Sequence, residues 1–318
     1  MLCTPLAAAV LGGACGRGTG DPAIQRLSIA TGGTGGVYYV YGGALAQALS
    51  RRLPGVEATA EVTSASVGNL RFVARRSADV AFTLGDVAAD AAHGRGRFEA
   101  PLPLRALAVL YPNVTHIVAR EGEGLASVAD LRGRRVSMGS PGSGTEVLAE
   151  RVLRAAGIEP GRDVERERLG VGESADALRD GRIDAFFWSG GLPTAAVLEL
   201  AATPRMRIRL LSDAALVDHL VAEHGPLYFT IEVPEGLYPG TAGVRASAVN
   251  NLLVVHAEMP EDLAYRIVKA LFEAKAELSA VHPAARELDP KTAAVGAPLP
   301  YHPGAVRYYR EVGAWAER

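Results

Sequence analysis

The feature that most constrains the fold is a regular alternation of short β-branched segments with longer amphipathic segments, each short segment ending in Gly, Ser or Asp. The first cycle is the strand-like LSIAT at 27–31, followed by a segment at 37–53 with apolar residues at helical spacing. This rhythm is typical of βαβ units, in which helices join parallel strands and cover the sheet. The chain is therefore expected to be an α/β protein.

The alternation continues along the chain and divides it into two similar halves. The predicted strands are 27–31, 56–62, 78–84, 104–111, 115–120, 134–140, 164–170, 183–189 and 248–259, and the predicted helices are 37–53, 64–75, 146–156, 174–179, 194–201, 261–279 and 305–316. The two strands beside Pro112–Asn113 are interpreted as a crossover into a second lobe. We expect two lobes, each a mixed sheet flanked by helices, with hinge crossovers and a central cleft: lobe 1 is 27–112 with 241–318, and lobe 2 is 113–240.

Composition excludes several classes of protein. A chain of 318 residues is longer than most single cores, which rarely exceed about 250 residues. With 48% hydrophobic and 21% charged residues, disorder as the main state is excluded. The 33 basic residues do not exceed the 35 acidic ones, so the clustered excess of cations that marks a nucleic-acid binder is absent. No apolar run approaches the roughly 20 residues that span a bilayer.

The N-terminus resembles an export signal. The apolar, small-residue stretch at 1–15 ends in Gly13-Ala14-Cys15, which resembles a bacterial lipobox, and a polar Gly-rich segment follows at 16–26. We expect 1–26 to be a signal peptide, lipid anchor and tether, with Cys15 acylated and the mature protein extracytoplasmic, in the periplasm or on the outer face of the cytoplasmic membrane. Cys3 would leave with the signal, so no disulfide is expected. The alternative is an apolar N-terminus with two incidental cysteines.

Three polar loops follow predicted strands and precede predicted helices. In open α/β sheets, ligands lie beyond the carboxyl ends of the strands, where backbone N–H groups and helix N-termini bind anions. Glycines in these loops allow close approach of the backbone to a ligand. The residues expected to bind it are Thr34, Gly36 and Tyr39 in the first loop, Ser64, Ser66 and Asn69 in the second, and Ser140, Ser143, Gly144 and Thr145 in the third.

Each loop taken alone has a simpler interpretation. The first is also compatible with a tight turn that only connects a strand to a helix, and Ser64 is also a suitable helix cap. None of the loops is a dinucleotide fingerprint, a phosphate-binding P-loop or a nucleophile elbow. Three such loops at equivalent positions in two lobes favour an anion site that uses no cationic side chain.

Other polar and aromatic residues carry weaker predictions. The strand at 183–189 places Phe186 and Trp188 on one side and Phe187 on the other. Phe187 and Ser189 are expected to form the far wall of the cleft, with core packing as the alternative for Phe187. The seven histidines show no metal-binding spacing, so neither metal nor cofactor is expected. His116 is interpreted as a core or hinge residue.

Four segments together resemble one family of transport receptors. They are ATGGTGGVYYVYGGALAQALS, TSASVGNLRFVA, VSMGSPGSGTEVLAERVL and YHPGAVRYYREVG, which run in order from Leu27 to Gly313. The chain is similar to the solute-binding receptors of TRAP transporters, specifically the TAXI family. The resemblance implies a two-lobed periplasmic-binding-protein fold, a small carboxylate ligand such as glutamate or 2-oxoglutarate, and TRAP membrane permease subunits as partners. Where relatives tend to show Gln-Ser-Asp, this chain has Leu84-Gly85-Asp86.

The sequence therefore predicts a receptor that closes two lobes around a small carboxylate and catalyses no reaction. The rival hypothesis is an exported hydrolase that uses Ser140 or Ser143 as its nucleophile. Such an enzyme needs a base within hydrogen-bond reach of the serine, and the sequence offers no obvious candidate.

Overall fold

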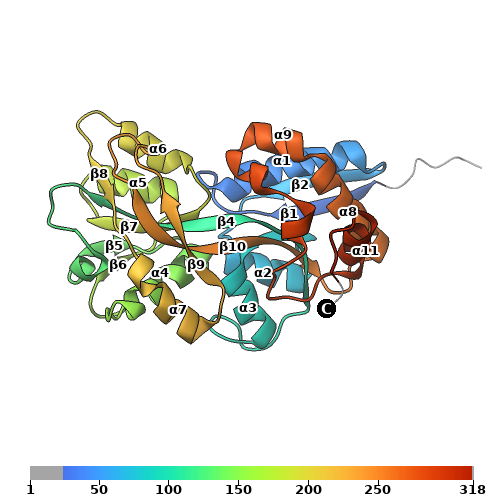
Figure 1. Cartoon of the computed structure of the whole chain (residues 1–318), viewed down its shortest axis with the longest axis horizontal. Helices are drawn as coiled ribbons and strands as arrows, with labels where there is room; N and C mark the ends of the chain where they lie inside the picture. The colour runs from blue at the N-terminus through green and yellow to red at the C-terminus, as the bar shows by residue number, and fades with distance from the viewer. Residues whose placement is uncertain (1–23, 317–318) are drawn as a thin grey trace, which may run out of the picture.

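The computed structural model describes residues 24–316, and Figure 1 shows two groups of helices and strands joined by the long central strands β4 and β10. The predicted signal peptide and the lipidation site Cys15 lie outside the described residues. The strands are β1 (Gln25–Ala30), β2 (Val56–Glu61), β3 (Val80–Leu84), β4 (Leu104–Arg120), β5 (Arg135–Ser137), β6 (Glu165–Glu167), β7 (Ala185–Gly190), β8 (Ile208–Leu210), β9 (Tyr228–Val233) and β10 (Val244–His256). The longer helices are α1 (Val37–Arg52), α2 (Ser66–Ala74), α3 (Gly85–His93), α4 (Gly144–Ala155), α5 (Val171–Arg179), α6 (Ala195–Ala202), α7 (Val217–His224), α8 (Glu261–Glu273), α9 (Lys275–Val281) and α11 (Pro303–Glu311). Short helical turns occur at η1 (Val128–Leu131), η2 (Ala214–Leu216), η3 (Pro283–Glu287) and α10 (Pro290–Ala293).

The strands form one connected mixed sheet in the order β2-β1-β3-β10-β4-β7-β5-β6, with β8 beside β4 and β9 beside β10. At one end β1 pairs in parallel with β2 and β3, and at the other β5 pairs in parallel with β6 and β7. The same three-strand arrangement therefore occurs twice, as the repeated rhythm of the sequence predicted. Helices follow these strands and flank the sheet, which confirms the α/β class.

The two strands predicted beside Pro112 are one continuous strand, so that prediction was wrong. β4 runs for 17 residues and pairs antiparallel with β10 along its first part and with β7 along its second. Pro112 has no N–H to donate, yet it is tolerated because the register of the β4–β10 ladder shifts between Asn250 and Leu252, opposite this proline. The long strands β4 and β10 thus connect the two halves directly.

Both long strands change partners near their middles. β10 pairs with β9 up to Val249 and with β3 from Asn251 onward, while β4 begins to pair with β7 at Val114. We propose these partner changes as the crossovers between the lobes. The second then lies further along the chain than the predicted boundary at residue 240, because the first part of β10 belongs with β9.

The C-terminal segment covers the first lobe. The helix predicted at 261–279 is two helices, α8 and α9, which meet at Ala274. This turn keeps Leu278 in the same apolar cluster as Ile267 and Leu45 of α1. The final helix begins at Pro303 and ends at Glu311, earlier than predicted. Helices α3 and α7 and strands β8 and β9 were not predicted.

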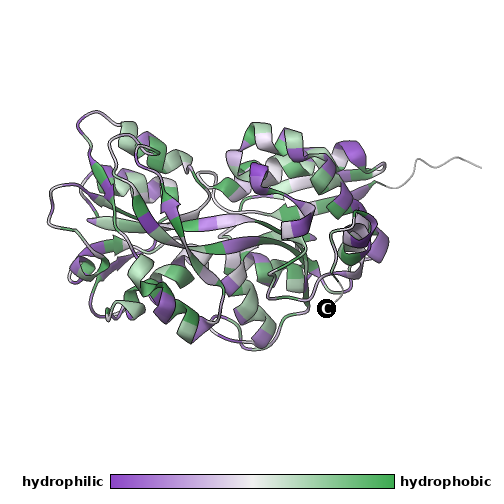
Figure 2. Ribbon diagram, in the orientation of Figure 1, coloured by the Kyte–Doolittle hydropathy of each residue, from purple (hydrophilic) through white to green (hydrophobic). Residues whose placement is uncertain are grey.

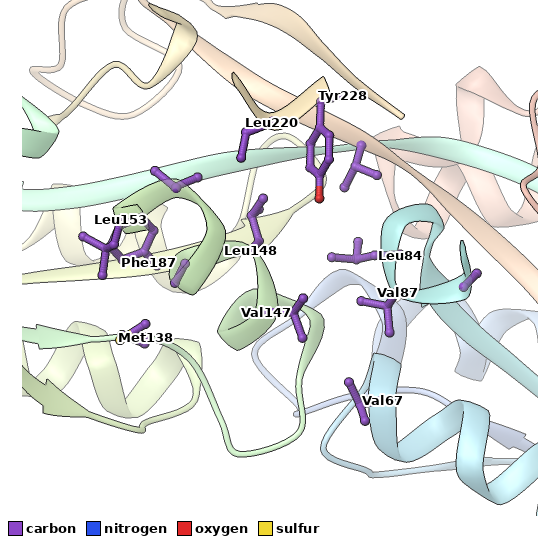
Figure 3. Close-up of a cluster of buried hydrophobic side chains, with 14 of the residues drawn as sticks. Val67, Leu84, Val87, Met138, Val147, Leu148, Leu153, Phe187, Leu220 and Tyr228 are labelled. Carbon is purple, nitrogen blue, oxygen red and sulfur yellow. The ribbon is translucent and has the colours of Figure 1, made fainter. Parts of the chain in front are cut away.

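Apolar side chains fill the space between sheet and helices. Helices such as α7 alternate purple hydrophilic with green hydrophobic residues (Figure 2), and the buried residues of α7 are the apolar Val217 and Leu220. One buried cluster extends across both halves: Val67 and Leu84 lie on one side of it, and Val147, Leu148 and Phe187 on the other (Figure 3). In the described part of the chain, no helix has the length and apolarity needed to cross a bilayer.

Candidate functional site

A cavity of about 320 Å³ lies where the carboxyl ends of strands from both lobes meet. This volume is at the small end of ligand pockets, which range from about 300 to 1,000 Å³. Its wall is formed by Gly32–Tyr38, Val62–Ser66, Leu84, Asn113, Ser140, Ser143–Thr145, Gly170–Glu173 and Trp188–Gly190. The three polar loops predicted from the sequence therefore line one cavity together.

Most of the predicted ligand-binding residues line this cavity. They are Thr34, Gly36, Ser64, Ser66, Ser140, Ser143, Gly144, Thr145 and Ser189. Three do not: Tyr39, Asn69 and Phe187. Asn69 and Phe187 are buried outside the cavity wall, and Tyr39 lies on the exposed side of α1.

Asn69 is completely buried and ties three backbone segments together. Its amide nitrogen donates to the carbonyl oxygens of Thr31 at 2.7 Å and Phe82 at 2.8 Å, and its oxygen accepts from the Thr63 hydroxyl at 2.6 Å. A side chain with all its hydrogen-bonding groups engaged has none left for a ligand. Asn69 therefore fixes the second loop against β1 and β3.

Neighbouring residues take the places predicted for Tyr39 and Phe187. Tyr39 is 36% exposed on the outer side of α1, whereas Tyr38, one residue earlier, lines the cavity. Phe187 is 1% exposed within the core, and the ring of Trp188 lies against Gly36 instead. The indole N–H of Trp188 donates to Thr194 at 2.9 Å, which fixes the ring.

Two parts of the wall were missed in the sequence. The segment Gly170–Glu173 follows β6 just as the second loop follows β2. A search for polar and glycine residues after every predicted strand would therefore have found it. Asn113 lies within β4 and carries no loop signal. Only the crossing of β4 between the lobes places its side chain at the cavity.

Five helices have an N-cap residue that lines the cavity, and at four of them a carbonyl or a side chain accepts from an N–H group at the N-terminus. At α3, which follows Leu84, Asp86 accepts from the N–H of Val87 at 2.8 Å. At α2, the N–H groups of Val67 and Gly68 donate to the Gly142 carbonyl at 3.1 and 3.4 Å. At α4, Ser143 caps the helix by accepting from the N–H of Glu146 at 3.0 Å. At α5, Glu173 accepts from the N–H of Gly170 at 3.0 Å.

The fifth helix, α1, has only a backbone contact at its start, because the N–H of Gly36 donates to the Gly33 carbonyl at 3.0 Å. No side chain caps Gly36, and no acidic residue stands in its first turn. The first turn of a helix presents N–H donors and a partial positive charge of about half a unit. None of the described residues that line the cavity is Lys or Arg. The start of α1 is therefore the strongest place in this wall for an anion.

The second loop contains a strained backbone position. Ala65, which precedes α2, has φ 73° and ψ −148° and lines the cavity. Such a conformation costs a residue with a side chain on the order of 1–3 kcal/mol. The Thr63 hydroxyl accepts from the N–H of Ala65 at 3.0 Å and holds it in place. Strain of this kind is concentrated at binding sites.

The two lobes are in contact around the cavity. A Cβ atom on Gly144 would lie 2.6 Å from both Leu84 and Ser66 of the opposite lobe, and one on Gly35 would lie 3.2 Å from Val171. Together with the bonds from α2 to Gly142, these contacts connect the lobes. In this structure the two lobes therefore touch each other beside the cavity.

A cluster of buried charges lies beside the cavity and joins the same two lobes. Arg151 of α4 donates to Asp86 at 2.8 Å and to Asp90 at 2.5 Å, both on α3. Tyr228 of β9 completes the cluster, since its hydroxyl donates to Asp86 at 2.7 Å and accepts from Arg151 at 2.8 Å. Every charge of this charge cluster has a partner.

The structure offers little support for the hydrolase hypothesis. Ser143 is the cap of α4, and no histidine is among the described residues that line the cavity. His116 is buried elsewhere, with Nε2 2.7 Å from the Tyr238 hydroxyl, and burial lowers the pKa of this histidine to about 4. Among residues 24–316, no group of His, Cys, Asp and Glu is placed to hold a metal ion.

Solved structures show the same fold at low sequence identity. A periplasmic transporter protein has a TM-score of 0.55 at 13% identity, with 91% of this chain and 93% of that one covered. The binding-protein component of an ABC phosphonate transporter from Pseudomonas aeruginosa has 0.53 at 10% identity, covering 82% and 78%. The alkanesulfonate-binding protein of Xanthomonas axonopodis pv. citri, bound to MOPS, has 0.51 at 18%, covering 92% of each chain.

These likenesses assign the fold to the periplasmic-binding-protein type, as the sequence predicted. A sequence model of a protein family matches residues 29–313, nearly all of the described chain. The chain belongs to the NMT1-like family.

Proposed function

We propose that this protein is an extracytoplasmic solute-binding receptor that captures a small carboxylate and delivers it to the permease of a membrane transporter. The observation that carries the proposal is a cavity between two touching lobes that exposes the start of α1, where no side chain caps the helix and none of the described lining residues is cationic. The likeness in fold to periplasmic binding proteins supports the receptor function. The glutamate and 2-oxoglutarate ligands implied by the TAXI resemblance suit a cavity of this volume.

The carboxylate subsite is the first turn of α1. A carboxylate there would accept from backbone N–H groups, and the hydroxyl groups of Thr34, Ser64 and Ser140 would supply further donors from both lobes. Charge-assisted hydrogen bonds of this kind contribute about 1.5–3 kcal/mol each. Because the donors come from both lobes, the ligand binds the closed state better and shifts the population toward it.

Two candidate permease partners follow from the likenesses. The four sequence segments favour TRAP permease subunits, whereas one of the structural neighbours is a component of an ABC transporter. We propose the TRAP permease, because the sequence resemblance extends from Leu27 to Gly313. Co-purification of the receptor with either class of permease from a membrane extract distinguishes them.

The site is tested by placing a charge beside α1 without a steric clash. A Cβ atom on Gly33 would meet nothing within 4 Å. Gly33→Asp should weaken binding of 2-oxoglutarate by about three- to thirtyfold, the size of a helix N-terminal charge interaction. The matched Gly33→Asn variant has the same shape without the charge and should weaken binding less. Calorimetric titration of protein freed of ligand by unfolding and refolding measures both.

Two controls complete the experiment. Arg179→Ala, on the exposed face of α5 where Arg179 pairs with Asp176, should leave the affinity unchanged. A neutral amide analogue should bind more weakly than the carboxylate to the unmodified protein. Equal affinities of the Asp and Asn variants would place the carboxylate away from α1.

Membrane attachment through Cys15 is a separate proposal, based on Gly13-Ala14-Cys15 and the polar segment after it. In a bacterial host, the full chain should partition with membranes and carry acyl mass on Cys15. Stable retention needs more than one acyl chain. Cys15→Ser should release the protein, and an unchanged distribution of that variant would contradict the anchor.

A further inference from the structure

A buried hydrogen-bond network below the cavity fixes the orientation of one side chain in its wall. Asn251 donates its amide N–H to the Tyr111 carbonyl at 3.1 Å, so its oxygen must face the other way. That oxygen accepts the proton of the Tyr38 hydroxyl. Burial raises the pKa of Tyr38 well above its usual value, so this donor stays protonated. The Tyr38 oxygen can then only accept, and Asn113 presents its amide N–H to it at 3.5 Å.

The side-chain carbonyl oxygen of Asn113 is the acceptor of this network that lacks a hydrogen-bond donor among the described residues. The side chain lines the cavity and is 2% exposed, and this oxygen has no partner within residues 24–316. The hydroxyl of Ser189, 6% exposed in the same wall, also has no partner there. A buried acceptor without a partner costs about 1–3 kcal/mol, so a site with such a group favours a ligand that satisfies it.

We propose that the ligand is a hydroxycarboxylate, whose hydroxyl donates to Asn113 while its carboxylate lies at α1. This inference rests on the proposed function and narrows its ligand. An oxo group in place of the hydroxyl would set an acceptor against the Asn113 oxygen. An ammonium group would find no buried carboxylate among the described lining residues, since Glu173 is exposed and already bonded to Gly170.

Matched acids that differ only at this group test the proposal. The first series is 2-hydroxyglutarate, 2-oxoglutarate and glutamate, and the second is lactate, pyruvate and alanine. Calorimetric titration of refolded, ligand-free protein should give the hydroxy acid at least about tenfold tighter binding than both partners in one series, because the open acceptor is satisfied only there. This comparison uses the unmodified protein.

Two variants connect the preference to Asn113. Asn113→Leu, which keeps the number and branching of the side-chain heavy atoms but removes its polar groups, should abolish the preference for the hydroxy acid. Thr115→Val is the matched control, because Thr115 is buried on the same strand and bonds Ser247 at 2.7 Å outside the cavity wall. It removes a buried hydroxyl and should retain the preference.

The outcomes separate this inference from the proposed function. If, in both series, an oxo or amino acid binds as tightly as its hydroxy partner, the hydroxycarboxylate is overturned and the carboxylate receptor stays in place. A preference that survives in Asn113→Leu would also overturn it. Failure of all six acids to bind would overturn both proposals.

Discussion

The cavity and the charge cluster beside it join the same two lobes but differ in how far their polar groups are satisfied. In the charge cluster, Arg151 has carboxylate partners on α3, and Tyr228 bonds both Arg151 and Asp86. Of the described residues that line the cavity, none is cationic, and Asn113 and Ser189 each have a polar atom without a partner there. Buried charge alone therefore does not identify a ligand-binding site. Among residues 24–316, the buried side-chain atoms without a partner belong to Asn113 and Ser189 in the cavity wall and to Tyr41, Tyr111, Arg166 and Arg266 outside it. An unsatisfied group therefore points to a ligand only where it lines a cavity that can hold one.

Removing the cation of the charge cluster should have the largest effect. Arg151→Met leaves Asp86 buried without its main partner, which should lower the free energy of unfolding by about 3–5 kcal/mol. Arg154→Met on the same helix is the control, because Arg154 is 47% exposed and should contribute less than about 1 kcal/mol. Urea denaturation measures both. Equal losses in the two variants would mean that the charge cluster has no special structural role.

The buried histidine of β4 should make stability depend on pH. His116 has a folded pKa of about 4, against about 6.5 in an unfolded chain. The unfolded chain therefore binds a proton that the folded one does not, and this contribution to stability is lost as pH falls from about 6.5 to about 4, by up to about 3 kcal/mol. His116→Gln should remove this part of the pH dependence.

The control for this variant is His219→Gln, since His219 is exposed on α7. Its stability should follow that of the unmodified protein across the same pH range. Parallel curves for all three proteins would show that His116 does not remain neutral in the fold. A loss of stability at low pH that His116→Gln removes and His219→Gln retains would show that His116 is neutral in the folded protein. This histidine lies on β4, the strand that also carries Asn113.

Adding one methyl group at the cavity should impair binding more than folding. Gly144→Ala would place a Cβ atom 2.6 Å from Leu84 and Ser66 and so oppose lobe closure. Overpacking of about 1–3 kcal/mol predicts roughly ten- to hundredfold weaker binding of 2-hydroxyglutarate. Gly43→Ala in α1 meets nothing within 4 Å and should leave affinity unchanged. Equal affinities in both variants would mean that closure at Gly144 is not required.

Much of the fold could be predicted from local patterns. The helix at Val37–Arg52 and the strand at Val56–Glu61 follow directly from the spacing of apolar residues and from Pro54 and Gly55 between them. The alternation that set Phe187 opposite Phe186 and Trp188 was also confirmed, since Phe187 lies in a different apolar cluster. The continuity of β4 could not be predicted, because Pro112 is tolerated only through a register shift supplied by a distant strand.

In the candidate site, as in the fold, features with a local sequence pattern could be predicted and features set by distant contacts could not. Loops were found because glycines and hydroxyl residues at strand ends have a local signature. Asn69 and Asn113 could not be told apart, because one is saturated by backbone carbonyls and the other keeps an open oxygen only through Tyr38 and Asn251. That distinction depends on contacts between residues far apart in the chain, which no local pattern records.

The insertion of β10 between β3 and β4 also determines when the chain can fold during synthesis. Leu253 pairs with Phe82 on one side and with Ala108 on the other, so neither neighbour acquires its partner until the last part of the chain has been made. Contacts of such long range are slow to form. The central sheet therefore stays incomplete until β10 has been made, although β1 can pair with β2 and β3, and β5 with β6 and β7, before then.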